Sequence, residues 1–76
     1  MATEAEQRVI DAARTVVRAT LAHVREMAAF DAGQTNPDVR WRLALAETFH
    51  STALDNLRAE SALIDAVDAL DAQVPA

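Results

Sequence analysis

The chain has 76 residues and a mass of 8.2 kDa, which allows one small domain and leaves no room for a second. Apolar residues make up 51% of the sequence and alanine alone fills 18 positions, against one glycine and two prolines, so the composition favours helices and excludes a multi-stranded β fold. The absence of cysteine rules out disulfides and thiolate chemistry, and the net charge of −5 argues against general affinity for nucleic acid or anionic lipid.

The beginning of the chain does not resemble a targeting segment. Glu4 and Glu6 stand where a signal peptide would carry basic residues, and no apolar segment follows them. No uninterrupted apolar run approaches the roughly 20 residues that a membrane span requires. We therefore expect a cytoplasmic protein.

The first helix is expected over about residues 4–32. Thr3 and Glu6 have the spacing of a capping box, in which the hydroxyl and the carboxylate satisfy the first free backbone N–H groups. Gly33 fits the left-handed position that often follows the last residue of a helix.

The turn is expected at residues 33–36 and the second helix over about residues 37–73. Asn36 followed by Pro37 is typical of the cap and first position of a helix, and Val74-Pro75-Ala76 stops the pattern. So short a connection forces the two helices to lie antiparallel.

A helical wheel at 100° per residue gives the first helix one apolar and one polar side. The polar side carries Gln7, Arg8, Asp11, Arg14, Arg18, Arg25 and Glu26. We expect the apolar side to be buried; it holds Val9, Ile10, Ala13, Val16, Val17, Thr20, Leu21, Val24, Met27 and Ala28.

The second helix has two apolar stripes, and a single neighbouring helix cannot cover both. The first stripe contains Val39, Leu43, Ala46, His50, Leu54, Leu57 and Ile64. The second stripe, roughly 135° away on the wheel at 100° per residue, contains Trp41, Leu45, Phe49, Leu63, Val67 and Leu70.

The uncovered stripe predicts self-association. A core in a chain this short rarely supplies more than about 3–5 kcal/mol, and a second copy would add the missing apolar contact. We therefore predict an all-α antiparallel two-helix hairpin that dimerises into a four-helix bundle, with an interface formed by Trp41, Leu45, Phe49, Leu63, Val67 and Leu70. The alternative is a three-helix bundle, with a break near residues 55–60 that lets the last third of the chain fold back.

Glu47 and His50 have the Glu-x-x-His spacing used by carboxylate bundles that bind two metal ions, so a di-metal protein is an alternative. With the turn centred near residues 34–35, the numbers of facing residues add up to about 69–70. This register places His50 opposite Thr20 rather than a carboxylate, and we expect His50 to be at least half buried beside Thr20. We therefore assign no metal and no cofactor.

Arginines suggest a second alternative, a small regulator or antitoxin-type protein that binds nucleic acid. Arg14, Arg18 and Arg25 form a stripe on the first helix, and Arg40-Trp41-Arg42 opens the second. Phosphate contacts with a stacking aromatic would use such residues. The chain lacks the short recognition helix and the basic surplus of a helix-turn-helix protein, which makes nucleic acid an unfavoured partner.

Residues 4–14 (EAEQRVIDAAR) and 63–70 (LIDAVDAL) are similar in style to the ends of small, uncharacterised helical proteins encoded by actinobacterial phages. Members of that group have no common activity. The resemblance implies a small accessory phage protein that acts by binding, with a host protein as its partner.

Catalysis is not indicated by any pattern in the chain. No Ser, Thr and His arrangement suits nucleophilic catalysis, and no glycine-rich loop could hold a phosphate. We therefore predict a non-enzymatic helical interaction module that associates with itself and docks a host or partner protein.

Overall fold

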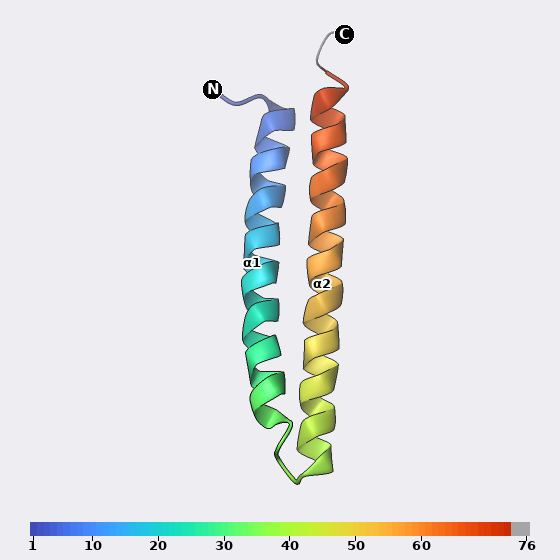
Figure 1. Cartoon of the computed structure of the whole chain (residues 1–76). Coiled ribbons are helices and arrows are strands. Elements are labelled where there is room, and N and C mark those ends of the chain that lie inside the picture. Colours follow the sequence, from blue (N-terminus) through green and yellow to red (C-terminus); the bar gives the residue numbers. More distant parts are fainter. Residues whose placement is uncertain (74–76) are drawn as a thin grey trace.

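The computed structural model describes residues 1–73, which form helix α1 (Glu4–Gly33), a turn and helix α2 (Val39–Asp71). The helices lie antiparallel, with the turn at one end and the start of α1 beside the end of α2 at the other (Figure 1). The hairpin measures 59 × 19 × 14 Å. The prediction of an all-α antiparallel hairpin is confirmed.

Helix α2 is continuous over its 33 residues, because neither glycine nor proline interrupts it. It passes through residues 55–60 without a break, so the three-helix alternative is wrong. The expected stop at Val74-Pro75-Ala76 lies outside the described residues.

The capping box at the start of α1 forms as the sequence predicts. The backbone N–H of Thr3 donates to Glu6 Oε1 at 3.0 Å, and the backbone N–H of Glu6 donates to Thr3 Oγ1 at 3.1 Å. Hydrogen bonding of the Glu6 carboxylate by the Thr3 backbone, and to a smaller extent by the Thr3 side chain, lowers the pKa of Glu6 from its ordinary value of 4.5.

Gly33 differs from the expectation, because it is the last residue of α1 and not a left-handed cap. None of the described residues has a positive φ angle. Glycine is required at this position because α2 approaches it closely. A Cβ atom at Gly33 would collide with Leu45 Cδ1 and lie 3.1 Å from Trp41 Cζ3. Gly33 is buried by these two side chains of α2.

Helix α2 begins later than expected, because Asp38 and not Asn36 is its cap. The Asp38 carboxylate accepts from the backbone N–H of Arg40 at 2.9 Å and of Trp41 at 3.4 Å. Asn36 instead accepts the backbone N–H of Asp38 at 2.8 Å. The turn therefore extends through Asp38, and its centre moves toward the second helix.

The longer turn changes the register of the hairpin. The Thr20 hydroxyl donates to Asn56 Oδ1 at 3.2 Å, and His23 Nδ1 lies 3.0 Å from Thr52 Oγ1. The numbers of these facing residues add up to 75 or 76, not to 69–70. The expectation that His50 lies beside Thr20 is therefore wrong.

The residues between the helices repeat at alternating spacings of four and three, the pattern of a coiled coil. All of them are buried or half buried. We call this set the seam; it consists of Ala5, Val9, Ala12, Val16, Ala19, His23, Glu26, Phe30 and Gly33 of α1, and Leu45, Phe49, Thr52, Asn56, Ala59, Leu63, Ala66 and Leu70 of α2.

Substitution of Gly33 tests the close approach at the turn. Gly33→Val places branched carbons against Leu45 and Trp41, and overpacking of this kind costs about 1–3 kcal/mol of unfolding free energy. The matched control is Ala32→Val on the exposed side of the same helical turn. Intrinsic helix propensity alone would make the control the more destabilising change. Urea unfolding, monitored by circular dichroism, measures the stability of the two variants. A control variant less stable than Gly33→Val would contradict the packing argument.

Acid titration tests the capping box. Because the pKa of Glu6 is lowered in the folded chain, its stabilising effect is present above the ordinary value of 4.5 and is lost as the pH falls through the lower folded value. Glu6→Gln keeps an oxygen acceptor but no charge. We expect a lower melting temperature than wild type at pH 7 and a difference that shrinks below pH 4.5. Glu47→Gln in the middle of α2 is the control, and a difference for Glu6→Gln that does not change with pH contradicts the prediction.

Candidate interaction surface

Large apolar side chains are exposed along both helices at the positions that directly follow seam residues. Val39 and Leu43 continue this spacing toward the start of α2. We call this surface the apolar face; it consists of Ile10, Ala13, Val17, Thr20, Val24 and Met27 of α1, and Val39, Leu43, Ala46, His50, Ala53, Leu57, Glu60, Ile64 and Val67 of α2.

Both halves of the apolar face lie on the same side of the hairpin. One residue step turns a helix by about 100°, and because the helices run in opposite directions with their seams facing, the step carries both halves to one side. Near the turn, Val39, Leu43 and Ala46 of this face line a groove together with Phe30, Gln34 and Arg42.

Exposure of the apolar face is extensive. Val17 is 58% exposed, Leu43 59%, Leu57 62% and Ile64 60%. Among the described residues, the buried apolar side chains are only Ala5 and Ala59. The hairpin therefore keeps its large apolar side chains mainly outside the seam.

The opposite face is formed by the residues that precede seam residues, and it has a different character. A groove on that side is lined by Arg8 and Asp11 of α1 and by Ala62, Asp65 and Ala69 of α2. Small and charged side chains thus cover this face. The contrast between the two faces makes the apolar face the candidate interaction surface.

The apolar side that the wheel assigned to the first helix divides between the seam, the apolar face and two exposed residues outside both, Leu21 and Ala28. Val9 and Val16 lie in the seam and are half buried. In contrast, Ile10, Leu21 and Val24 are 40%, 51% and 52% exposed. The expectation that all of these residues are buried in the hairpin is therefore wrong.

The six residues predicted to form an intermolecular interface occupy two environments. Trp41 and Val67 are exposed, although Trp41 also packs over Gly33. The other four are half-buried seam residues that face α1 in their own chain: Leu45, Phe49, Leu63 and Leu70. Contact between these residues and a second chain stays a prediction.

Phe49 has the clearest contacts of this group. Its ring stacks on Phe30 with a centroid distance of 5.0 Å and lies 4.9 Å from the ring of His23. Aromatic pairs at such distances stabilise a fold beyond the area that they bury. Phe49 therefore contributes to the hairpin itself.

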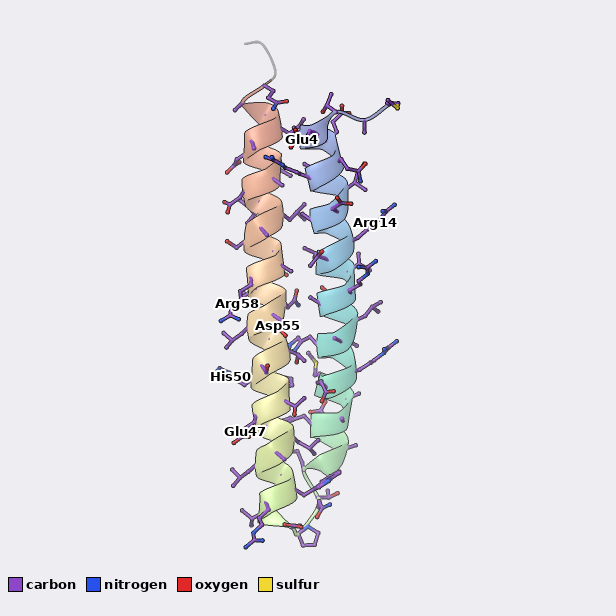
Figure 2. All side chains as sticks on the ribbon, turned by 180° about the vertical axis from the view of Figure 1, so that it is seen from behind. Glu4, Arg14, Glu47, His50, Asp55 and Arg58 are labelled. Atoms are coloured by element: carbon purple, nitrogen blue, oxygen red, sulfur yellow. The ribbon has the colours of Figure 1, made fainter. Side chains whose placement is uncertain are left out.

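Glu47 and His50 are exposed, on the side of α2 that points away from α1 (Figure 2). The expected burial of His50 is wrong, because Asn56 takes the place opposite Thr20. Among residues 1–73, no group of three or more His, Cys, Asp or Glu side chains is placed to hold a metal ion. Glu47 and His50 therefore lack further ligands in the described part of the chain.

The arginines of the first helix are exposed. Arg14 and Arg18 flank a shallow groove that Ile10, Ala13 and Val17 also line. Among the described residues, Arg8 and Glu4 form an ion pair within α1, with 3.0 Å between Arg8 Nη2 and Glu4 Oε1. Neither Arg8 nor Arg14 forms an ion pair with the carboxylates near the end of α2 in the described part of the chain.

Sequence reasoning missed the two polar contacts between the helices. Thr20 with Asn56 and His23 with Thr52 are part-buried hydrogen-bonded pairs that join α1 to α2. The signal was available in the sequence, because His23, Thr52 and Asn56 fall on the alternating spacing of four and three residues. These pairs hold the two helices in register.

The chain matches no protein family model, no curated protein and no solved structure. Neither α1 nor α2 is both long and apolar enough to cross a membrane. The geometry of the hairpin is therefore the basis for the functional argument.

Truncation of Phe49 tests its contribution to the seam. Phe49→Ala removes both ring contacts, and because the side chain is only half buried we expect a loss of about 2 kcal/mol, below the value for a fully buried phenylalanine. Thr48→Ala, at the exposed neighbouring position, is the control and should change unfolding free energy by no more than about 0.5 kcal/mol. Equal unfolding free energies of the two variants would show that the aromatic cluster does not stabilise the hairpin.

Proposed function

We propose that this protein is a non-enzymatic helical interaction module that associates with itself, two hairpins forming a four-helix bundle. The observation that carries the proposal is the apolar face, which joins large exposed side chains of both helices on one side of the hairpin. Contiguous apolar surfaces of this kind mark sites of association in soluble proteins.

The surface area of the hairpin supports association. Its accessible surface is 5753 Å². A compact monomer of the same mass would expose about 4,500 Å². The excess is about 1,200 Å² per chain, and two chains that cover it would bury about 2,400 Å², within the range of obligate homodimers.

The composition of the seam gives a second reason. Alanine, glycine, threonine and asparagine occupy much of it, so a single hairpin buries little apolar area. A second apolar contact would offset part of the conformational entropy lost when the helices form. In a four-helix bundle each helix has two such contacts, one with its own hairpin and one with the other.

Light scattering after gel filtration tests the proposal. We expect a mass of at least twice the 8.2 kDa of the chain. The melting temperature should rise with protein concentration, because folding is linked to assembly. A mass of 8.2 kDa together with a melting temperature independent of concentration would overturn self-association.

A further inference from the structure

We propose that a second copy of the chain covers the apolar face, with its turn at the opposite end, so that α2 packs on α2 and His50 of each copy lies beside Glu60 of the other. The inference rests on the proposed self-association and adds the surface, the orientation and the contacts. Its support comes from the symmetry of the apolar face and from the charges at the two ends of the hairpin.

Two hairpins stacked face to face allow two orientations. A two-fold axis along the helices puts both turns at one end and sets α1 on α2 of the other copy. A two-fold axis across the helices puts the turns at opposite ends and sets each helix on its own counterpart. With the axis across the helices, each helix contacts its own counterpart running in the opposite direction. Such an isologous contact requires the surface of each helix to be complementary to itself when the helix is reversed.

Helix α2 meets this requirement. The midpoint of Val39–Asp71 is Asp55, and His50 and Glu60 stand five residues before and after it. They are the two ionisable side chains on the α2 part of the apolar face. Reversal about Asp55 brings the imidazole of one copy to the carboxylate of the other, which is a charge-complementary contact at two symmetric places.

The apolar residues of α2 follow the same symmetry. Reversal about Asp55 sets Leu43 against Val67 and Ala46 against Ile64. All four residues are on the apolar face, so the face matches itself from Leu43 to Val67, whereas Val39 is set against Asp71. Large side chains meet smaller ones in both pairs, which favours interdigitation.

Helix α1 is matched about the same axis. In the register of the hairpin, in which the numbers of facing residues add up to 75 or 76, the level of Asp55 corresponds to residues 20–21 of α1. Reversal about that level sets Val17 against Val24, two residues of the apolar face. One axis across the hairpin therefore brings apolar-face residues of both helices against their own counterparts.

The ends of the hairpin differ in charge. At the turn, Arg40 and Arg42 are balanced by Asp31 and Asp38. The open end carries one arginine, Arg8, and five carboxylates: Glu4, Glu6, Asp65, Asp68 and Asp71. Turns at the same end would bring two acidic ends together, whereas turns at opposite ends set each acidic end against one without net charge, which favours the reversed orientation.

Disulfide trapping tests the surface and the orientation, because the wild-type chain has no cysteine. A chain with Ala46→Cys is mixed with a mass-tagged chain with Ile64→Cys and oxidised under native conditions. The matched control is Thr48→Cys mixed with Ala62→Cys, two positions equally spaced about Asp55 on the opposite face. We expect a mixed disulfide from the first mixture that is lost in denaturant, and none above the denatured background from the second.

Charge reversal tests the pairing of His50 with Glu60. His50→Glu sets carboxylates against each other twice in the dimer, and we expect the dissociation constant to rise at least about tenfold. Adding Glu60→Arg should restore it. Ser51→Glu, at the next position but on the opposite face, should leave it unchanged. Sedimentation equilibrium gives the three values.

The outcomes separate this inference from the proposed function. A wild-type dimer without the mixed disulfide between positions 46 and 64, or without rescue by Glu60→Arg, would overturn the surface and its orientation while self-association stands. A mixed disulfide between positions 48 and 62 would overturn the choice of face. A wild-type chain that stays monomeric at every concentration would overturn both.

Discussion

The close packing of small side chains between α1 and α2 is the constraint on which the rest of the structure depends. Alanine recurs along the seam, and Gly33 lets Leu45 and Trp41 close over the end of α1. Helices with small contact residues approach nearer to each other than helices with large ones. The same choice of residues limits the apolar area that the hairpin can bury.

A seam rich in alanine specifies its register poorly, because one alanine is much like another. The polar pairs supply the missing information. A shift of one heptad would place Thr20 opposite Phe49 or Leu63 instead of Asn56, and its hydroxyl would lose a partner. An unpaired polar group in a part-buried contact costs free energy, so the observed register is preferred over its neighbours.

Local signals in the sequence predict the hairpin well, but they do not decide which apolar residues face each other. The capping box and the scarcity of glycine and proline place the helices, because these effects act within one turn of the chain. The wheel at 100° per residue does not separate the residues of the seam from those of the apolar face. A coiled-coil seam drifts on such a wheel by about 20° per heptad, so Val9 and Val16 merge with Ile10 and Val17. At 3.5 residues per turn the seam separates from the apolar face.

The predicted register of the two helices is wrong for a different reason. Asn36 and Asp38 are both suitable helix caps, and each is worth about 1 kcal/mol, so local energetics cannot choose between them. The choice depends on contacts far away in the sequence, where Trp41 and Leu45 pack over Gly33. The later cap accounts for part of the change in register, in which the numbers of facing residues add up to 75 or 76 instead of 69–70, and the residue opposite Thr20 is Asn56 and not His50.

In the proposed assembly, one property of the sequence links folding to association. Small residues in the seam weaken the isolated hairpin, because they bury little apolar area. They also let α1 and α2 approach closely, which brings the two halves of the apolar face toward each other. Larger seam residues would strengthen the monomer and at the same time separate the halves of that surface. In the proposed assembly, the large apolar side chains that lie outside the seam are covered by the second copy, which completes the core that one hairpin leaves small.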